Sequence, residues 1–199
     1  MQNPYPLLIE TPFPILTPRL LIRPSRPGDG PAFNEAVNSS LARLGKWLPW
    51  ANHPHTHEES ENTARRHETE YLLRENFVLP IFDRNSNRLL GGSGLHRVDW
   101  SLPKFEIGYW IREGEEGKGI VSEAVIAITR YAFQKLKAKR VEIRCAPENL
   151  RSRAIPERLG FQLDGCLRLD TLLPNKELSD SLIFSRLNDQ GLPALDVFW

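Results

Sequence analysis

Residues 105–132, FEIGYWIREGEEGKGIVSEAVIAITRYA, contain in order the signals of a strand, a glycine-rich loop and a helix. Residues 105–111 alternate and are rich in aromatic and β-branched side chains, which predicts a buried or half-buried strand. Three glycines then crowd into residues 114–119, and from Ile120 the apolar residues recur three or four positions apart. This change of period predicts a helix that begins at Ile120.

The junction between loop and helix is a candidate anion site. The first turn of a helix has N–H groups without partners inside the helix and carries a partial positive charge. Glycines just before it let the backbone approach an anion closely. We therefore interpret residues 117–122 as a cradle for a phosphate or pyrophosphate. The alternative is a glycine-rich surface turn that binds nothing.

Two phosphate-binding motifs fit this loop incompletely. A P-loop needs Ser or Thr after its lysine, whereas Gly119 follows Lys118 here. A dinucleotide fingerprint needs a third glycine, and Ser122 stands in that place. Glu142 lies roughly where a ribose-binding acid is expected, so a dinucleotide-binding module stays open as an alternative. The chain lacks the repeated β-α-β halves of that fold.

Composition places the chain among ordinary globular proteins. Its 199 residues suffice for one domain with a substantial core. A net charge of +1 gives no reason to expect a nucleic acid or an anionic membrane as partner. Cys145 and Cys166 fit a reducing compartment. Residues 1–15 do not resemble a signal peptide, and no apolar stretch reaches the roughly 20 residues of a membrane span. We therefore expect a cytoplasmic protein.

The rest of the chain predicts mostly antiparallel neighbouring strands joined by helices. Residues 140–145 should run parallel to residues 105–111, because a long helical crossover joins them. Asp29 is a plausible helix cap. The expected strands are 17–24, 77–82, 89–96, 105–111, 140–145, 167–172 and 178–187, and the expected helices are 29–44, 58–76, 120–139 and 149–159.

Aromatic and histidine residues follow the first predicted helix. His53, His55 and His57 alternate, but a loop without nearby cysteine is poor evidence for a closed metal site, so we expect no metal. We expect Trp47, Trp50 and the histidine loop to border a ligand-binding site, with a core position as the favoured alternative for Trp47.

Taken together, these motifs resemble the GNAT superfamily of acyl-CoA N-acyltransferases, in particular its RimJ/RimL-type branch. They occur in order over about residues 17–187, nearly the whole chain, and the ordered set is far more specific than one glycine loop. This chain has Gly114 where the superfamily often has Arg or Gln. The matching segments are 17–23, 47–50, 106–110, 117–120, 122–124, Asn149 with Ser152, and 155–161.

The resemblance implies an α/β (α+β) fold, with a mixed, mostly antiparallel twisted sheet flanked by helices and a central β-α-β acyl-CoA site. It divides the chain into an N-terminal extension (1–16), an N-acetyltransferase domain (17–187) and a C-terminal tail (188–199). The implied enzyme uses acetyl-CoA as cosubstrate and no metal. Its acceptor would be a protein N-terminal α-amine, such as that of a ribosomal protein, and a small amine is the alternative. A homodimer is also implied.

The resemblance also implies positions for the cosubstrate. The pantetheine arm would lie between strands 107–111 and 141–145, which would diverge there, and it would pair with main chain near Ile111. Asn149 matches an amide that contacts the cofactor, and Ser152 matches a hydroxyl that hydrogen-bonds or protonates the leaving sulfur. The pyrophosphate would bind the N–H groups of Gly117, Lys118, Gly119, Ile120 and Val121.

The reaction needs a base, because most amines are protonated at pH 7. A carboxylate acting through water can accept the proton. Glu106 on the central strand is the first candidate and Asp170 on the closing hairpin is the second; an ion pair on a strand face is the other interpretation of Glu106. Cys145 is interpreted as a packed thiol. A nonenzymatic acyl-CoA or nucleotide-binding module stays the alternative class, which an activity assay would distinguish.

Overall fold

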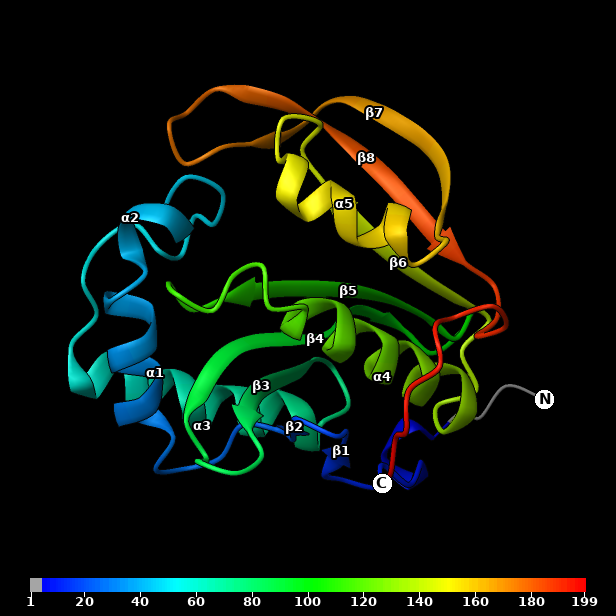
Figure 1. Cartoon of the computed structure of the whole chain (residues 1–199), viewed down its shortest axis with the longest axis horizontal. Coiled ribbons are helices and arrows are strands. Elements are labelled where there is room, and N and C mark those ends of the chain that lie inside the picture. The colour runs from blue at the N-terminus through cyan, green and yellow to red at the C-terminus, as the bar shows by residue number, and fades with distance from the viewer. Residues whose placement is uncertain (1–4) are drawn as a thin grey trace.

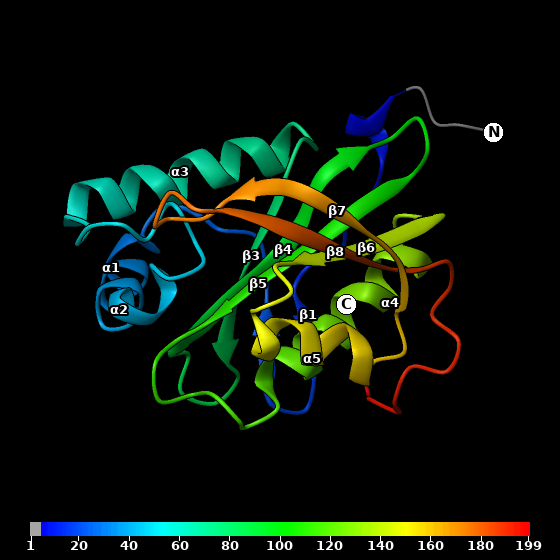
Figure 2. The same cartoon turned by 90° about the horizontal axis from the view of Figure 1, so that it is seen from above.

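The architecture is one eight-stranded sheet with helices on both faces (Figures 1 and 2). The computed structural model describes residues 5–199, and in that range no helix has the length and apolar character needed to cross a bilayer. The strands are β1 (Ile15–Leu16), β2 (Leu20–Ile22), β3 (Phe77–Asp83), β4 (Leu89–Asp99), β5 (Lys104–Ile111), β6 (Arg140–Cys145), β7 (Gln162–Leu172) and β8 (Leu178–Arg186). The helices are η1 (Pro6–Leu8), α1 (Gly30–Asn38), α2 (Leu41–Leu44), α3 (His57–Leu72), α4 (Ile120–Gln134) and α5 (Leu150–Arg158).

The strand order, β1-β2-β3-β4-β5-β6-β8-β7, confirms the predicted mixed sheet. Only β5 and β6 pair in parallel; every other neighbouring pair is antiparallel. The crossover α4 joins them, as predicted from the change of period at Ile120. Since a dinucleotide-binding fold requires repeated parallel units, this topology rules it out.

Two apolar clusters hold the helices against the sheet. Phe105 and Ile107 of β5 are fully buried and belong to the cluster that contains the apolar side of α4. On the other face, Phe33 of α1 and Ala64 of α3 pack with Phe82 and other strand residues. Figure 2 shows α3 on one side of the sheet and α4 on the other. Successive β5 side chains therefore point to different helical layers.

The parallel strands β5 and β6 separate after a short contact. They pair only from Lys104 with Arg140 to Glu106 with Glu142. From there β6 continues against β8 as far as Cys145, so it leaves the rest of β5 without a partner on that side. The predicted divergence of these two strands is confirmed, and it opens the sheet at the amino end of α4.

Several predicted boundaries were wrong. The helix expected over 29–44 is two helices, broken at Ser39 and Ser40, where the Ser40 hydroxyl bonds the Ala36 carbonyl at 2.7 Å. Asp29 precedes α1 but does not cap it, because Arg23 binds its carboxylate through two contacts of 2.7 Å. Helix α4 ends at Gln134 rather than 139, since Lys137 adopts a left-handed φ of 58°. Strand β7 begins at Gln162 rather than 167, and the short strand β1 was missed.

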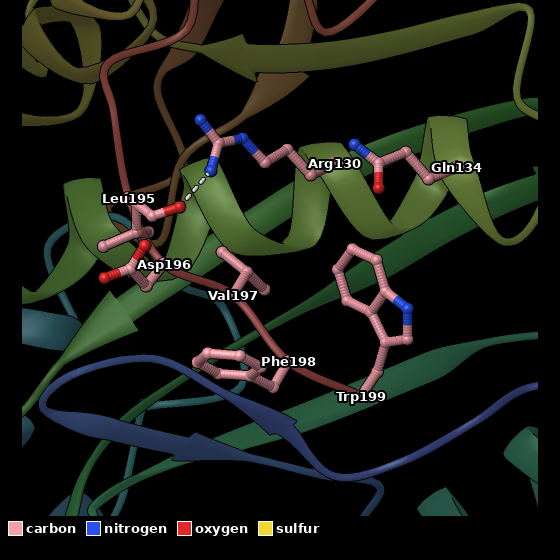
Figure 3. A pocket seen from close by; sticks show the side chains of 7 residues that line it. All are labelled: Arg130, Gln134, Leu195, Asp196, Val197, Phe198 and Trp199. Carbon is pink, nitrogen blue, oxygen red and sulfur yellow. Dashed lines mark hydrogen bonds between the residues drawn. The ribbon is translucent and has the colours of Figure 1, made fainter.

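The last residues dock on α4 and β1 (Figure 3). Leu16 and Phe198 exchange main-chain hydrogen bonds of 2.7 and 2.9 Å. Arg130 of α4 donates to the Leu195 carbonyl, and the Trp199 ring packs against the core beside α4. The tail is thus held by backbone pairing and by the packing of Leu195 and Trp199, whereas the Phe198 ring stays largely exposed.

Candidate active site

The loop before α4 presents a row of backbone donors. Gly117 and Gly119 have φ angles of 73° and 77°, which glycine adopts without strain. The helical bond pattern starts with Glu123 N–H donating to the Gly119 carbonyl at 3.0 Å. Within residues 5–199, no oxygen accepts a hydrogen bond from the N–H groups of residues 117–122. The donors predicted to hold an anion are therefore not occupied by the protein itself.

Lys118, in the middle of this loop, pairs sideways with an acid. Its Nζ lies 2.8 Å from Glu115 Oε2, and Glu115 also accepts from Arg88 at 2.7 Å. The two cations hold the pKa of Glu115 below its ordinary value, led by the hydrogen bond from Lys118. The positive charge of Lys118 is thus partly neutralised, which leaves the backbone N–H groups as the main candidates in this loop for binding an anion.

The open edge of β5 supplies main-chain groups to the gap. Arg112 N–H donates to the Leu90 carbonyl at 2.8 Å, so even-numbered residues of β5 bond β4 and odd-numbered ones face the β6 side. Past Glu106 this side has no strand partner. Arg43 of α2 donates a hydrogen bond to the Ile111 carbonyl at 2.6 Å. Tyr109 main chain and the Ile111 N–H therefore face the gap, where an extended amide ligand could pair as an added strand.

Ser152 lies beside this gap at the start of α5. Asn149 caps the helix, since its Oδ1 accepts from the Ser152 N–H at 3.2 Å. The Tyr109 hydroxyl donates to the Ser152 carbonyl at 2.8 Å, and the Ser152 hydroxyl donates to the Tyr109 oxygen at 3.2 Å. Burial raises the pKa of Tyr109 far above its ordinary value, so the phenol keeps its proton. The structure thus brings Asn149 and Ser152 together and adds Tyr109.

Tyr109 was not recognised as a site residue from the sequence. The available signal was the alternation of β5, which places residue 109 on the same face as the buried Phe105 and Ile107. Its contact with α5 joins residues far apart in the chain, and no local pattern reveals such a contact. The two hydrogen bonds hold the Tyr109 and Ser152 hydroxyls at fixed positions beside the gap.

Glu106 projects from the opposite face of β5, because strand side chains alternate. Its Oε2 lies 3.1 Å from Arg97 Nε and 3.3 Å from Arg144 Nε, yet this buried oxygen accepts no aligned hydrogen bond within the described residues. Burial raises the pKa of Glu106, although the charges of Arg97 and Arg144 oppose the rise. Glu106 and Ser152 thus flank the gap from opposite faces instead of touching.

Two further carboxylates lie near Glu106. Burial would raise the pKa of Glu142, but hydrogen bonds from Arg140 and Arg144 bring that pKa below its ordinary value. The charges of Glu142 and Asp170 add to the raised pKa of Glu106. When two neighbouring carboxyl groups have pKa values shifted in opposite directions, the one with the higher pKa can accept a proton while the other stays charged. The raised pKa of Glu106 and the lowered pKa of Glu142 favour Glu106 as the base. Asp170, the second candidate, is close enough for its charge to act on Glu106.

Cys145 ends β6 next to the same gap. Its side chain is buried, and burial raises the pKa of the thiol to about 11. The group is therefore a neutral thiol at pH 7 and a weak nucleophile. This agrees with the predicted packed thiol and with direct transfer rather than a covalent enzyme intermediate.

A cleft of about 1280 Å³ lies between α2 and the turn that joins β7 to β8. Figure 1 shows that these two elements lie at the same end of the molecule. Trp47 lines the cleft and is only half-buried, so the core position favoured for it was wrong. Trp50 is 42% exposed and packs edge-on against Trp110. Glu148, three residues after the end of β6, also lines the cleft.

The histidine loop makes local contacts. His53 lies 3.6 Å from Glu59, and His55 contacts the Trp50 carbonyl at 3.1 Å. No group of three or more His, Cys, Asp or Glu side chains placed to hold a metal occurs in the part of the chain that the structure describes.

The Tyr109–Ser152 pair makes a testable prediction. We expect Ser152→Ala and Tyr109→Phe each to lower kcat by about threefold to tenfold, because a leaving thiol of pKa near ~8.5 needs little assistance. The double variant should lose no more than the larger single loss, since both hydroxyls act through one hydrogen bond. Initial rates of thiol release from acetyl-CoA measure this. Losses that multiply in the double variant would show that the two hydroxyls act independently.

A row of unpaired backbone N–H groups, a gap between two parallel strands and a buried carboxylate fit an acyl-group transferase. Comparison with known proteins places the chain more narrowly. Residues 19–162 match the family described as Acetyltransferase (GNAT) domain, and the chain belongs to this family. The predicted fold and N-acetyltransferase class are thereby confirmed.

Individual relatives agree with this assignment. The putative ribosomal N-acetyltransferase YdaF of Bacillus subtilis (strain 168) is 36% identical over 84% of this chain and 91% of that protein. Ribosomal-protein-serine acetyltransferase of Escherichia coli (strain K12) is 28% identical over 72% of this chain and 80% of that protein. A solved structure of RimL, the ribosomal L7/L12 alpha-N-protein acetyltransferase, in complex with coenzyme A has a TM-score of 0.81 at 24% identity, and the match covers 87% of this chain and 96% of that one. This likeness shows that the two chains share a fold.

Proposed function

We propose that this enzyme transfers the acetyl group of acetyl-CoA to the N-terminal α-amine of a protein, such as a ribosomal protein. The observation that supports this most is the large cleft lined by α2, by Glu148 just after β6 and by the β7–β8 turn, which offers room for a polypeptide end. Relatives named as ribosomal-protein acetyltransferases support the same acceptor class.

In this proposal the backbone holds the donor. The pyrophosphate binds the N–H groups of residues 117–121, where the unpaired donors and the helix dipole favour an anion. The pantetheine amides pair with Tyr109 and Ile111 along the open edge of β5. The thioester then lies near Asn149 and Ser152, because these residues flank the same gap.

The transfer step follows from the groups around the gap. The neutral amine attacks the thioester carbonyl; a C–N bond forms and the C–S bond breaks. Glu106 accepts the amine proton through water, and the Ser152 hydroxyl hydrogen-bonds or protonates the departing sulfur. Holding a neutral amine at pH 7 costs about 1.4 kcal/mol for an α-amine and about 4.6 kcal/mol for lysine. This difference favours α-amines over lysine side chains as acceptors.

Mass spectrometry of acetylated peptides tests the acceptor. The substrates are peptides with a free N-terminal Ser or Ala and one internal Lys, matched peptides with a blocked N-terminus, and small polyamines. We expect acetylation of the α-amine and at least a tenfold lower rate on blocked peptides and polyamines. Faster acetylation of lysine or of small amines would contradict a protein N-terminus as the acceptor.

The cytoplasmic location and the homodimer belong to the same proposal. Support for a dimer comes from β7, the edge strand of the sheet, whose residues are all exposed. Unpaired strand edges and exposed apolar side chains favour association. The exposed leucines on this strand are Leu163, Leu167, Leu169 and Leu172.

A further inference from the structure

The first turn of α4 is tied to the β1–β2 turn by one buried carboxylate. Glu123 accepts from the Thr17 hydroxyl at 2.6 Å and from Arg19 Nε at 2.6 Å. Arg19 Nη2 also lies 2.6 Å from the same carboxylate, which is only 9% exposed. These contacts join residues 17–19 to the first turn of α4, about 100 positions later in the chain, and they fix the start of that helix.

Arg19 reaches the loop itself as well. Its Nη1 donates to the Lys118 carbonyl at 2.9 Å. Its Nη2 lies 3.5 Å from the point that a Cβ on Gly119 would occupy. The guanidinium therefore stands directly beside the residue that begins α4.

These contacts do not use all the N–H donors of the Arg19 side chain. A guanidinium has five N–H donors in a fixed plane. Within residues 5–199, Nε and Nη2 bind Glu123 and Nη1 binds the Lys118 carbonyl, which uses three. One N–H on each terminal nitrogen is left, and the side chain is 50% exposed. Lys118, by contrast, is paired with Glu115, and Gly114 has no side chain to contribute.

We propose that Arg19 is a cofactor-binding residue: it fixes the loop through Glu123 and Lys118 and directs its remaining N–H groups to the pyrophosphate of acetyl-CoA. The inference rests on the proposed position of that pyrophosphate at residues 117–121 and is independent of the acceptor. The planar fork suits both tasks, because one guanidinium can bind a carboxylate on one edge and a phosphate on another.

The test compares CoA binding by calorimetry with transfer from a donor that has no phosphates. We expect Arg19→Ala to raise the Kd for CoA about tenfold, in line with the loss of one charged hydrogen bond. Arg19→Gln should give a similar loss and keeps a polar side chain if the alanine variant does not fold. With S-acetyl-pantetheine as donor, kcat/KM should change by less than about twofold for a residue that acts on phosphate.

Arg84→Ala is the matched control. Arg84 donates to the Thr17 carbonyl at 2.9 Å but touches neither the loop nor Glu123, so CoA binding should stay within about twofold of wild type. Unchanged CoA affinity in both Arg19 variants would overturn the proposal, and so would equal losses with acetyl-CoA and S-acetyl-pantetheine. Because calorimetry with CoA alone needs no acceptor, failure here is distinguishable from a wrong acceptor assignment.

Discussion

Glu106→Gln is expected to lower kcat by about 100-fold to 1000-fold, the range for removal of a general base. The amide keeps the shape and the buried position but cannot accept the amine proton. The KM for acetyl-CoA should stay within about threefold, because the residue lies across the gap from the proposed donor-binding groups. Steady-state rates with an N-terminal Ser peptide give both constants.

The pH profile separates a base from a structural ion pair. Only the carboxylate form accepts a proton, and burial raises the pKa of Glu106. Wild-type kcat should therefore fall as the pH drops through this raised pKa, and Glu106→Gln should lack that acidic limb. Asp170→Asn is the comparison: if it removes the limb and Glu106→Gln retains it, Asp170 is the base and our assignment is wrong.

The second large effect concerns charge at the anion seat. Ser122 stands in the first turn of α4, and its hydroxyl accepts from Arg158 at 3.3 Å. Ser122→Asp adds a negative charge beside the proposed pyrophosphate. At a separation of ~5 Å and an effective dielectric constant near ~20, two unit charges repel by about 3 kcal/mol. We expect a tenfold to hundredfold rise in the KM for acetyl-CoA, about 1.4 to 2.7 kcal/mol.

Ser122→Asp should keep the fold, so a change in its KM for acetyl-CoA reports on cofactor binding rather than on unfolding. An acidic side chain in the first turn of a helix is stabilising by about 0.3–1 kcal/mol, so the Tm should be unchanged or higher. Ser122→Asn has nearly the same shape without the charge and should raise KM by less than about threefold. A normal KM in the aspartate variant would mean that the pyrophosphate binds elsewhere.

The sequence predicted the parts whose signal is local. The change from alternating to helical period at Ile120 located α4, and two glycines marked the loop that turns into it. The β3–β4 hairpin followed from two apolar runs around a polar turn. The divergence of β5 and β6 was expected from the family resemblance, and the pairing that stops at Glu106 confirmed it.

Contacts between distant parts of the chain could not be predicted in this way. Arg19 and Glu123 are about 100 positions apart, and Tyr109 meets Ser152 across the gap; neither pair leaves a pattern within one element. The break after α1 was missed because the apolar spacing continues from Val37 to Leu41 across the two serines. The Ser40 hydroxyl bonds the Ala36 carbonyl, and such a local contact competes with helical hydrogen bonds.

Hydrogen exchange of the backbone amides at residues 117–122, with and without CoA, tests the central claim most directly. These N–H groups have no acceptor within the described part of the protein, so they should exchange quickly alone. Saturating CoA should slow their exchange at least tenfold, together with that of the Ile111 amide. Protection confined to other segments, with residues 117–122 exchanging as before, would contradict a pyrophosphate site made by the backbone at the start of α4.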